Sequence, residues 1–220
     1  MSIDRSWREA EAKWLQRPEF GMKRQMLQAI SGDSEALAGY EGWRDQLDEL
    51  WSKLFARPTI KLLDEIFFAL PSEDRAHALI FAFERIESDD LFWIALAKWW
   101  SSFDAIDHVA MNELMRRRSA AWTPDCMTKK NRRKYQALPD RLTIYRGQDL
   151  AGEIKFCWTL DHRVAEGFAR GHRGIRHPNP IIYVATTEKN YIALYQSERK
   201  EAEVILLQQP NIDLTATRMF

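Results

Sequence analysis

The sequence predicts an α+β protein, in which an all-helical N-terminal region is followed by a smaller mixed α and β region. Apolar residues recur at helical spacing from Ile3 to about Ala121, whereas beyond Pro139 they gather in short, strand-like runs. Eight of the nine tryptophans lie in the first region, where such large rings are more typical of a helical core than of a cofactor pocket. A single α+β unit, with the helices packed directly on the sheet, is the alternative architecture.

Turn signals divide the N-terminal region into successive helices. Pro58 separates two apolar stripes, which predicts one helix before it and another after it. Pro71-Ser72-Glu73-Asp74 predicts the next helix start, because acidic residues favour the first turn of a helix. Further helices are expected over 89–101 and 103–118. We interpret 1–127 as a helical domain that binds a target or regulates the rest of the chain.

Composition and charge narrow the functional classes. Of the 220 residues, 45% are hydrophobic and 29% charged, which is typical of a globular protein. Residues 1–127 hold 16 basic and 22 acidic residues, whereas residues 128–220 hold 16 basic and 10 acidic ones. The positive second part suits an anionic ligand such as a dinucleotide or a nucleic acid. The acidic first part suits contact with that second part or with a basic partner.

Some classes of site are not expected. The two cysteines, Cys126 and Cys157, are too few for a disulfide framework and lack the spacing of zinc ligands, so we expect no metal. The sequence has no apolar run of membrane-spanning length, and its start lacks the apolar block of a signal peptide. We therefore expect a cytoplasmic protein without a membrane partner.

A basic segment and a series of short strands follow the helical region. Five of the six residues from Lys129 to Lys134 are cationic, and we interpret 128–137 as a basic linker, with the cations on a solvated linker or helix end and phosphate binding as the alternative. Beyond it we expect strands over 141–146, 154–160, 181–185 and 202–207. One helix is expected over 161–170, with Asp161 as its N-cap and Gly171 as its stop.

Three segments of this mixed region carry candidate site residues. In the first, Arg146 ends an apolar strand and Gly147 follows, which places a planar donor suited to phosphate where a ligand can approach the backbone; a surface salt bridge is the alternative. In the second, Cys157 and Thr159 share one strand face and can line a site, while Trp158 points elsewhere. A cationic loop, 171–178, follows the helix and could close over a pyrophosphate; an exposed basic hairpin is the alternative.

The third segment places two acids at the start of an apolar strand. Residues i and i+2 of an extended chain point the same way, so Glu201 and Glu203 are expected to share one face. Burying a charge without a partner costs several kcal/mol, so an acid pair here indicates a site. An edge strand with a solvated end is the alternative reading.

In this order the three segments resemble the Arg, Ser-Thr-Ser and Glu-x-Glu signature of the mono-ADP-ribosyltransferase superfamily, in its arginine-type branch, as found in phage and bacterial proteins. The resemblance covers about 138–208 and implies a small catalytic domain over 138–220, with a split antiparallel sheet. It implies NAD as the ADP-ribose donor, Glu203 as the catalytic acid, and Glu201 as the residue that orients or deprotonates the attacking group. It also implies that Tyr195 and Gln196, in the preceding turn, contact the acceptor. The NAD-binding residues that it implies are Tyr145, Arg146, Gly147, Cys157, Thr159, Phe168 and Arg173.

The expected function is NAD-dependent mono-ADP-ribosyl transfer to an intracellular macromolecule, with a protein favoured over a nucleic acid as acceptor. A phage-encoded effector and a toxin of the bacterial cytoplasm both fit. NAD hydrolysis is an alternative, and would need Arg146 and Glu203 but not Glu201. A module that binds NAD, nucleic acid or protein without catalysis is another. Cys157 departs from the family pattern, because a thiol is a poorer hydrogen-bond donor than the usual serine hydroxyl.

Overall fold

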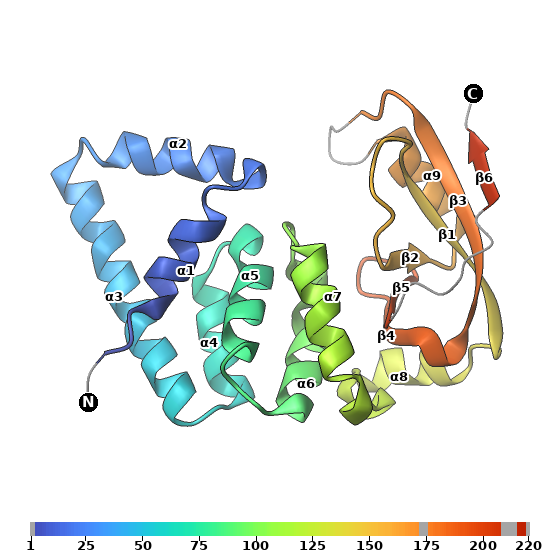
Figure 1. Ribbon diagram of the computed structural model, residues 1–220, viewed down its shortest axis with the longest axis horizontal. Helices are drawn as coiled ribbons and strands as arrows, with labels where there is room; N and C mark the ends of the chain where they lie inside the picture. The colour runs from blue at the N-terminus through green and yellow to red at the C-terminus, as the bar shows by residue number, and fades with distance from the viewer. Residues whose placement is uncertain (1–2, 172–175, 208–214, 219–220) are drawn as a thin grey trace. The chain divides into compact units, whose positions relative to one another are not determined.

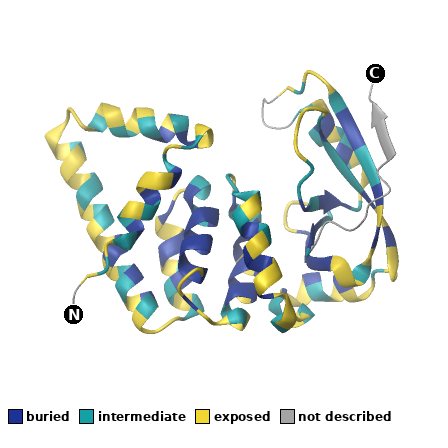
Figure 2. Cartoon of the chain, in the orientation of Figure 1, coloured by how far each residue is buried: buried dark blue, intermediate teal, exposed yellow. Residues whose placement is uncertain are grey.

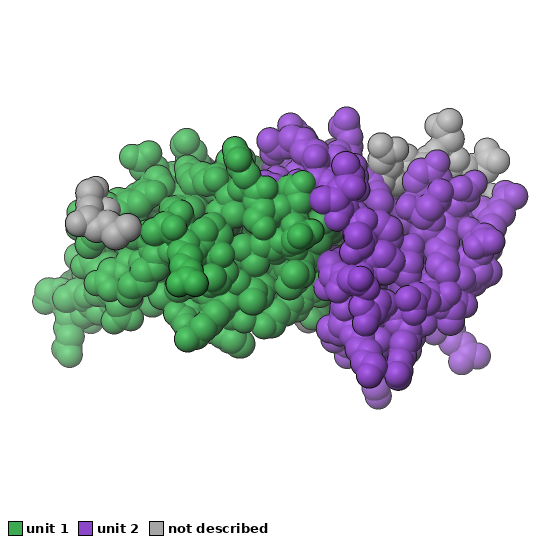
Figure 3. All heavy atoms as spheres, turned by 90° about the horizontal axis from the view of Figure 1, so that it is seen from below, with its two compact units in different colours: residues 1–107 green, residues 108–220 purple. Residues whose placement is uncertain are grey.

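The computed structural model describes residues 3–171, 176–207 and 215–218, and confirms the α+β class (Figure 1). The chain divides into two compact units, 1–107 and 108–220, which Figure 3 distinguishes by colour. The first unit is helical, and the second contains the antiparallel sheet together with the helices that follow residue 107.

The division falls before the boundary expected at 127, and residues 128–137 are not a linker. Most of this segment forms α8 (Lys129–Gln136), which begins where the Thr128 side chain accepts a hydrogen bond from the Asn131 backbone N–H. Asn131 and Tyr135 are buried on the side of α8 that packs on the sheet, while the cationic residues occupy its other faces. The sequence interpretation did not predict this buried side, because Asn131 and Tyr135, although four residues apart as on one helix face, lie within a run dominated by five cations.

Three helices of the first unit begin at residues whose side chains cap them. Asp33, Thr59 and Ser88 accept hydrogen bonds from backbone N–H groups in the first turns of α3, α4 and α6. The start expected at 72 is confirmed, whereas the helix expected over 103–118 begins only at residue 108, because the chain is extended at Phe103, whose ring is buried. The helices of this unit are α1 (Ser6–Trp14), α2 (Gly21–Ile30), α3 (Ser34–Ala56), α4 (Ile60–Ala69), α5 (Ser72–Phe83) and α6 (Asp89–Trp99).

Aromatic rings fill the core of the helical unit, where α5 is buried along most of its length (Figure 2). Trp7 of α1 stacks on Trp51 of α3, with ring centroids 4.9 Å apart, and Phe81 of α5 meets Trp51 edge-on at 5.0 Å. The prediction that the tryptophan-rich region forms a core is confirmed by six buried indoles: Trp7, Trp14, Trp51, Trp93, Trp99 and Trp100.

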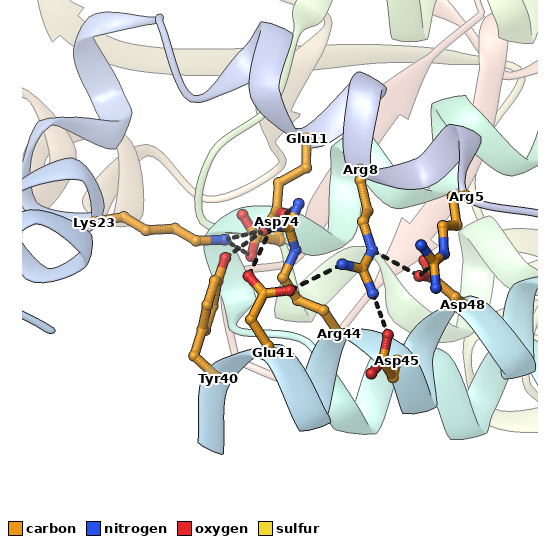
Figure 4. A network of polar contacts seen from close by, with 10 residues as sticks. All are labelled: Arg5, Arg8, Glu11, Lys23, Tyr40, Glu41, Arg44, Asp45, Asp48 and Asp74. Carbon is orange, nitrogen blue, oxygen red and sulfur yellow. Dashed lines mark hydrogen bonds and ion pairs between the residues drawn. The ribbon is translucent and has the colours of Figure 1, made fainter. Parts of the chain in front are cut away.

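A network of buried ion pairs joins α1, α2, α3 and α5 (Figure 4). The Lys23 ammonium of α2 lies between the carboxylates of Glu11 and Asp74, and Glu11 also lies 3.2 Å from the guanidinium of Arg44. Burial raises the pKa of Asp74, and the charge of Lys23 opposes this shift. Removing one partner of such a network leaves a buried charge uncompensated, which costs about 3–5 kcal/mol.

His77 of α5 is buried beside this network. Its ring lies 5.3 Å from the ring of Trp14 and 5.2 Å from that of Phe20, measured between centroids. Burial lowers the pKa of His77 to about 4, and the nearby positive charge of Arg17 lowers it further. The imidazole is therefore neutral at pH 7 in the folded state.

We predict that His77 makes the helical unit less stable in mild acid. The unfolded state binds a proton near pH 6.5 and the folded state only near pH 4, so the stabilisation present above pH 6.5 is lost as pH falls between these values. The loss reaches about 3 kcal/mol. Urea unfolding of wild type and His77→Leu at pH 7 and pH 4.5 tests this. Lowering the pH from 7 to 4.5 should reduce the unfolding free energy of wild type more than that of His77→Leu. If the difference between the two proteins is the same at both pH values, the lowered pKa of His77 is contradicted.

The sheet of the second unit is antiparallel, with the strand order β4-β5-β2-β1-β3-β6. Among the described residues, a single register pair, Tyr145 with Thr159, joins β1 to β2, so the sheet is divided into two three-stranded parts. The strand expected over 154–160 is only three residues long, and β4 was not expected. The strands are β1 (Arg141–Asp149), β2 (Cys157–Thr159), β3 (Pro180–Glu188), β4 (Ile192–Gln196), β5 (Glu203–Leu206) and β6 (Thr215–Arg218).

Two further helices belong to this unit: α7 (His108–Arg117), which precedes α8, and α9 (His162–Arg170), which lies between β2 and β3 in the sequence. The prediction of α9 is confirmed at both ends. Asp161 accepts a hydrogen bond from the Arg163 backbone N–H at 2.8 Å, and Gly171 ends the helix with φ 109°. The helix lies against β1 and β3 through Ala165 and Ala169 (Figure 1).

Gly147 is required by this helix packing. A Cβ atom at residue 147 would lie 1.8 Å from the carbonyl oxygen of Ala165 and 2.6 Å from the backbone nitrogen of Ala169. This close packing is a reason for glycine that the sequence interpretation, which considered only the approach of a ligand to the backbone, did not include. The missing side chain makes room for α9.

We predict that Gly147→Ala destabilises the second unit by about 3 kcal/mol, because the helix must move away from the strand. The matched control is Gly167→Ala on α9, where a Cβ meets nothing within 4 Å. That variant should be about 0.5–1 kcal/mol more stable than wild type, because alanine favours a helix interior over glycine. Denaturant unfolding measures both free energies, and equal effects of the two substitutions would contradict this packing.

Candidate functional site

A pocket of about 190 Å³ opens where β1, β2 and α9 meet the start of β5. It is smaller than the ~300–1,000 Å³ typical of pockets that enclose a whole small-molecule ligand, so it suits one end of a larger molecule. Among the described residues, the three sequence segments singled out above supply all those that border it: Tyr145, Arg146, Gly147, Cys157, Trp158, Thr159, Phe168, Glu201 and Glu203.

Strand register explains how these distant segments meet. Tyr145 of β1 lies opposite Thr159 of β2, and Thr159 lies opposite Glu203 of β5. Residues that lie opposite one another on antiparallel strands have Cβ atoms about 4.5–5.5 Å apart. One row across the sheet therefore brings together the arginine segment, the small-polar segment and the acidic segment.

Arg146 is held in a fixed orientation. Its Nε donates to Gln148 Oε1 at 2.6 Å, and its Nη1 donates to the carbonyl oxygen of Cys157 at 2.5 Å. Burial lowers the pKa of this guanidinium, while its interactions with Cys157 and Glu203 raise it. A half-buried cation with this support is suited to an anionic ligand, because charge-assisted hydrogen bonds to phosphate are strong and directional.

Thr159 connects the pocket to the turn that carries Glu201. Its hydroxyl donates to the carbonyl oxygen of Glu201 and accepts a hydrogen bond from the Asp161 backbone N–H at 3.1 Å. The backbone N–H of Leu160 donates to the carbonyl oxygen of Ala202 at 3.1 Å. The end of β2 therefore holds the peptide groups on both sides of Ala202.

Glu201 and Glu203 both border the pocket, but not through the strand alternation that the sequence suggested. The strand β5 begins only at Glu203, and Ala202 is left-handed, with φ 44°. A left-handed alanine costs roughly 1–2 kcal/mol, so the hydrogen bonds from β2 must hold this kink. The acid pair is thus formed by a turn followed by a strand.

Cys157 is a neutral thiol at physiological pH. Burial raises its pKa, and the charge of Glu203 raises it further. Because the thiolate is the reactive form of cysteine, this residue is not a nucleophile, and the thiol is left as a weak hydrogen-bond donor. Cys126 is also free, and burial raises its pKa to about 12.

Two of the expected site residues are placed wrongly by the sequence interpretation. Tyr195 and Gln196 do not lie in an exposed turn but end β4, with 6% and 5% of their surfaces exposed. The backbone N–H of Tyr195 contacts Met127 Sδ at 3.4 Å. The apolar run that precedes them continues as a strand, so they are not positioned to contact an acceptor.

Two other residues complete the comparison with the expected site. Arg173 lies outside the described residues. Trp158 was expected to point away, yet it borders the pocket, and its indole nitrogen is buried without a hydrogen bond to any described residue. Strand alternation gave no signal for Trp158, because β2 is too short for alternation to define its surroundings.

Within the described ranges, no three His, Cys, Asp or Glu side chains gather as a metal site would require. No helix there has the combination of length and apolar character needed to cross a membrane.

No protein-family model, curated protein or solved structure matches the chain.

Proposed function

We propose that the protein is an NAD-dependent mono-ADP-ribosyltransferase that modifies an intracellular macromolecule. One observation carries the proposal: three segments that follow one another in the order of the ADP-ribosyltransferase signature border the same pocket. Arg146, Thr159 and Glu203 come from three different strands, and adjacent pairing of those strands supports a common role.

The proposed reaction breaks the bond between C1′ of the nicotinamide ribose and the ring nitrogen. The bonding electron pair leaves with nicotinamide, which becomes neutral, and positive charge develops on the ribose. The carboxylate of Glu203 would stabilise this charge. A nucleophilic atom of the acceptor then bonds to C1′, and Glu201 would take the proton that this atom loses. NAD⁺ and the acceptor thus give nicotinamide, the ADP-ribosylated acceptor and a proton.

The other pocket residues suit the binding of NAD. The two hydrogen bonds of Arg146 use Nε and one N–H of Nη1, so a phosphate or ribose oxygen would accept from Nη2 or from the second N–H of Nη1. The pocket volume suits the nicotinamide end of the dinucleotide, with the remainder outside it. Cys157 and Thr159 would take the serine positions of the signature, although the Thr159 hydroxyl already donates to the Glu201 carbonyl.

The helical unit would select the acceptor. Residues 1–107 contain 13 basic and 20 acidic residues, a net charge of −7, which favours contact with a basic partner. We propose a protein as the acceptor and the cytoplasm as the place of action, as for a phage effector or a bacterial toxin.

NAD hydrolysis is the second candidate, and one observation favours it. The residues expected to contact an acceptor, Tyr195 and Gln196, are buried in β4. With water as the attacking group, the same Arg146 and Glu203 would suffice. A module that binds NAD without cleaving it is a third outcome of the experiment below.

We predict different effects for the two acids when the pure protein is incubated with adenine-labelled NAD and a cell lysate. Glu203→Gln should slow nicotinamide release about 100-fold or more, because it removes the charge that stabilises the transition state. Glu201→Gln should lower label transfer at least about 100-fold, because the acceptor is no longer deprotonated. It should lower nicotinamide release less than Glu203→Gln does, because water can still attack C1′. Glu188→Gln, at the exposed end of β3, is the matched control and should behave as wild type.

The wild type separates the candidate functions in the same assay. Nicotinamide release with a labelled acceptor supports transfer, and release without any labelled acceptor supports hydrolysis. If the wild type consumes no NAD, both enzymatic proposals fail.

A further inference from the structure

Asn131 is a buried polar residue whose side chain is directed at the end of β4 and at the turn that follows it. Only 1% of its surface is exposed. Its Nδ2 donates to Gln196 Oε1 at 3.0 Å and to Glu198 Oε1 at 2.8 Å, and its Oδ1 accepts a hydrogen bond from Ser197 Oγ at 2.8 Å. Both amide protons and the amide oxygen are thereby used, and the bond to the Glu198 carboxylate is charge-assisted.

The turn that Asn131 holds, 197–202, carries Glu201 to the pocket. At its start, the Ser197 backbone N–H donates to Glu198 Oε2 at 3.0 Å, and the Lys200 N–H donates to the Ser197 carbonyl at 3.2 Å. Near its end lie the bonds from Thr159 and Leu160 described above, and both Lys200 and Ala202 are left-handed. The turn is therefore held at its start by α8 and near its end, at Glu201 and Ala202, by β2.

Helix α8 is fixed independently of this turn. The Tyr135 hydroxyl donates to the Lys189 carbonyl at 3.3 Å, and the Lys189 ammonium donates back to the carbonyl oxygens of Gln136 and Leu138. The Thr128 cap holds the other end of the helix. A substitution of Asn131 should therefore loosen the turn while α8 remains in place.

We propose that Asn131 is a positioning residue that sets the place of Glu201 relative to the acceptor, through the turn 197–202. Asn131 does not border the pocket, whereas the backbone of Glu203 is held by the pairing of β5 with Thr159 of β2 and with Gln196 of β4. This inference rests on the proposed transferase function. With the turn loosened, NAD cleavage continues but the acceptor is no longer deprotonated in place. A water oxygen then bonds to C1′ and releases its proton to solvent, so ADP-ribose is lost by hydrolysis.

The test compares Asn131→Ala and Asn131→Asp with Tyr135→Phe, which also removes hydrogen bonding from the buried side of α8 but does not contact the turn. Adenine-labelled NAD and lysate proteins are the probes. In both Asn131 variants the share of cleaved NAD that is transferred should fall about tenfold, because small misplacements of a reacting group are costly. Total nicotinamide release and the KM for NAD should stay within about twofold of wild type. Tyr135→Phe should retain the wild-type share.

Hydrogen exchange gives a second measurement that does not depend on activity. Backbone amides of 197–202 should exchange faster in Asn131→Ala than in wild type or Tyr135→Phe, while those of 157–160 stay unchanged. An unchanged transferred share in an active enzyme, or unchanged exchange of the turn, overturns the role of Asn131. If the wild type fails to cleave NAD while the turn exchanges faster in the variant, the proposed function fails but the clamp on the turn stands.

Discussion

Tyr145 and Thr159 join the two parts of the sheet at a single described register pair, and the geometry of the pocket depends on that junction. On one side, β1 supplies Arg146 within a long pairing with β3. On the other, β2 pairs with β5 and brings Glu203 into the same row. Because β2 is only three residues long, the helix and turns around it must hold the junction in place.

Packing and polar contacts provide this support from two sides. α9 lies so close to β1 that Gly147 cannot carry a side chain, which fixes the strand beside Arg146. α8 lies on the sheet at β4 and binds the start of the turn that leads to Glu201. The result is a small pocket in which a fixed cation, a neutral thiol and two acids lie on supports that belong to different elements. Such an arrangement suits a ligand that carries a negative charge on one group, such as a phosphate, and develops a positive charge on another group, such as a ribose, during the reaction.

Local rules predicted much of this unit from the sequence. The cap at Asp161 and the stop at Gly171 define α9, because side-chain hydrogen bonding and backbone conformation are decided by neighbouring residues. The convergence of Arg146, Thr159 and Glu203 was expected only through a family resemblance, since strand order is not readable from local pattern. The sequence also could not show that α8 has a buried side, that β4 includes Tyr195, or that a left-handed Ala202 sets the acid pair. Each of these depends on contacts between residues far apart in the chain.

The most direct test of the central claim is calorimetric titration of NAD into the wild type and Arg146→Lys, with Arg141→Lys, exposed on the same strand, as the control. Lysine keeps the charge but cannot reproduce the planar, two-bond support of the guanidinium. The account predicts one NAD bound per chain in wild type and control, and binding at least about tenfold weaker in Arg146→Lys. Absence of NAD binding to the wild type, or equal affinity in all three proteins, would contradict it.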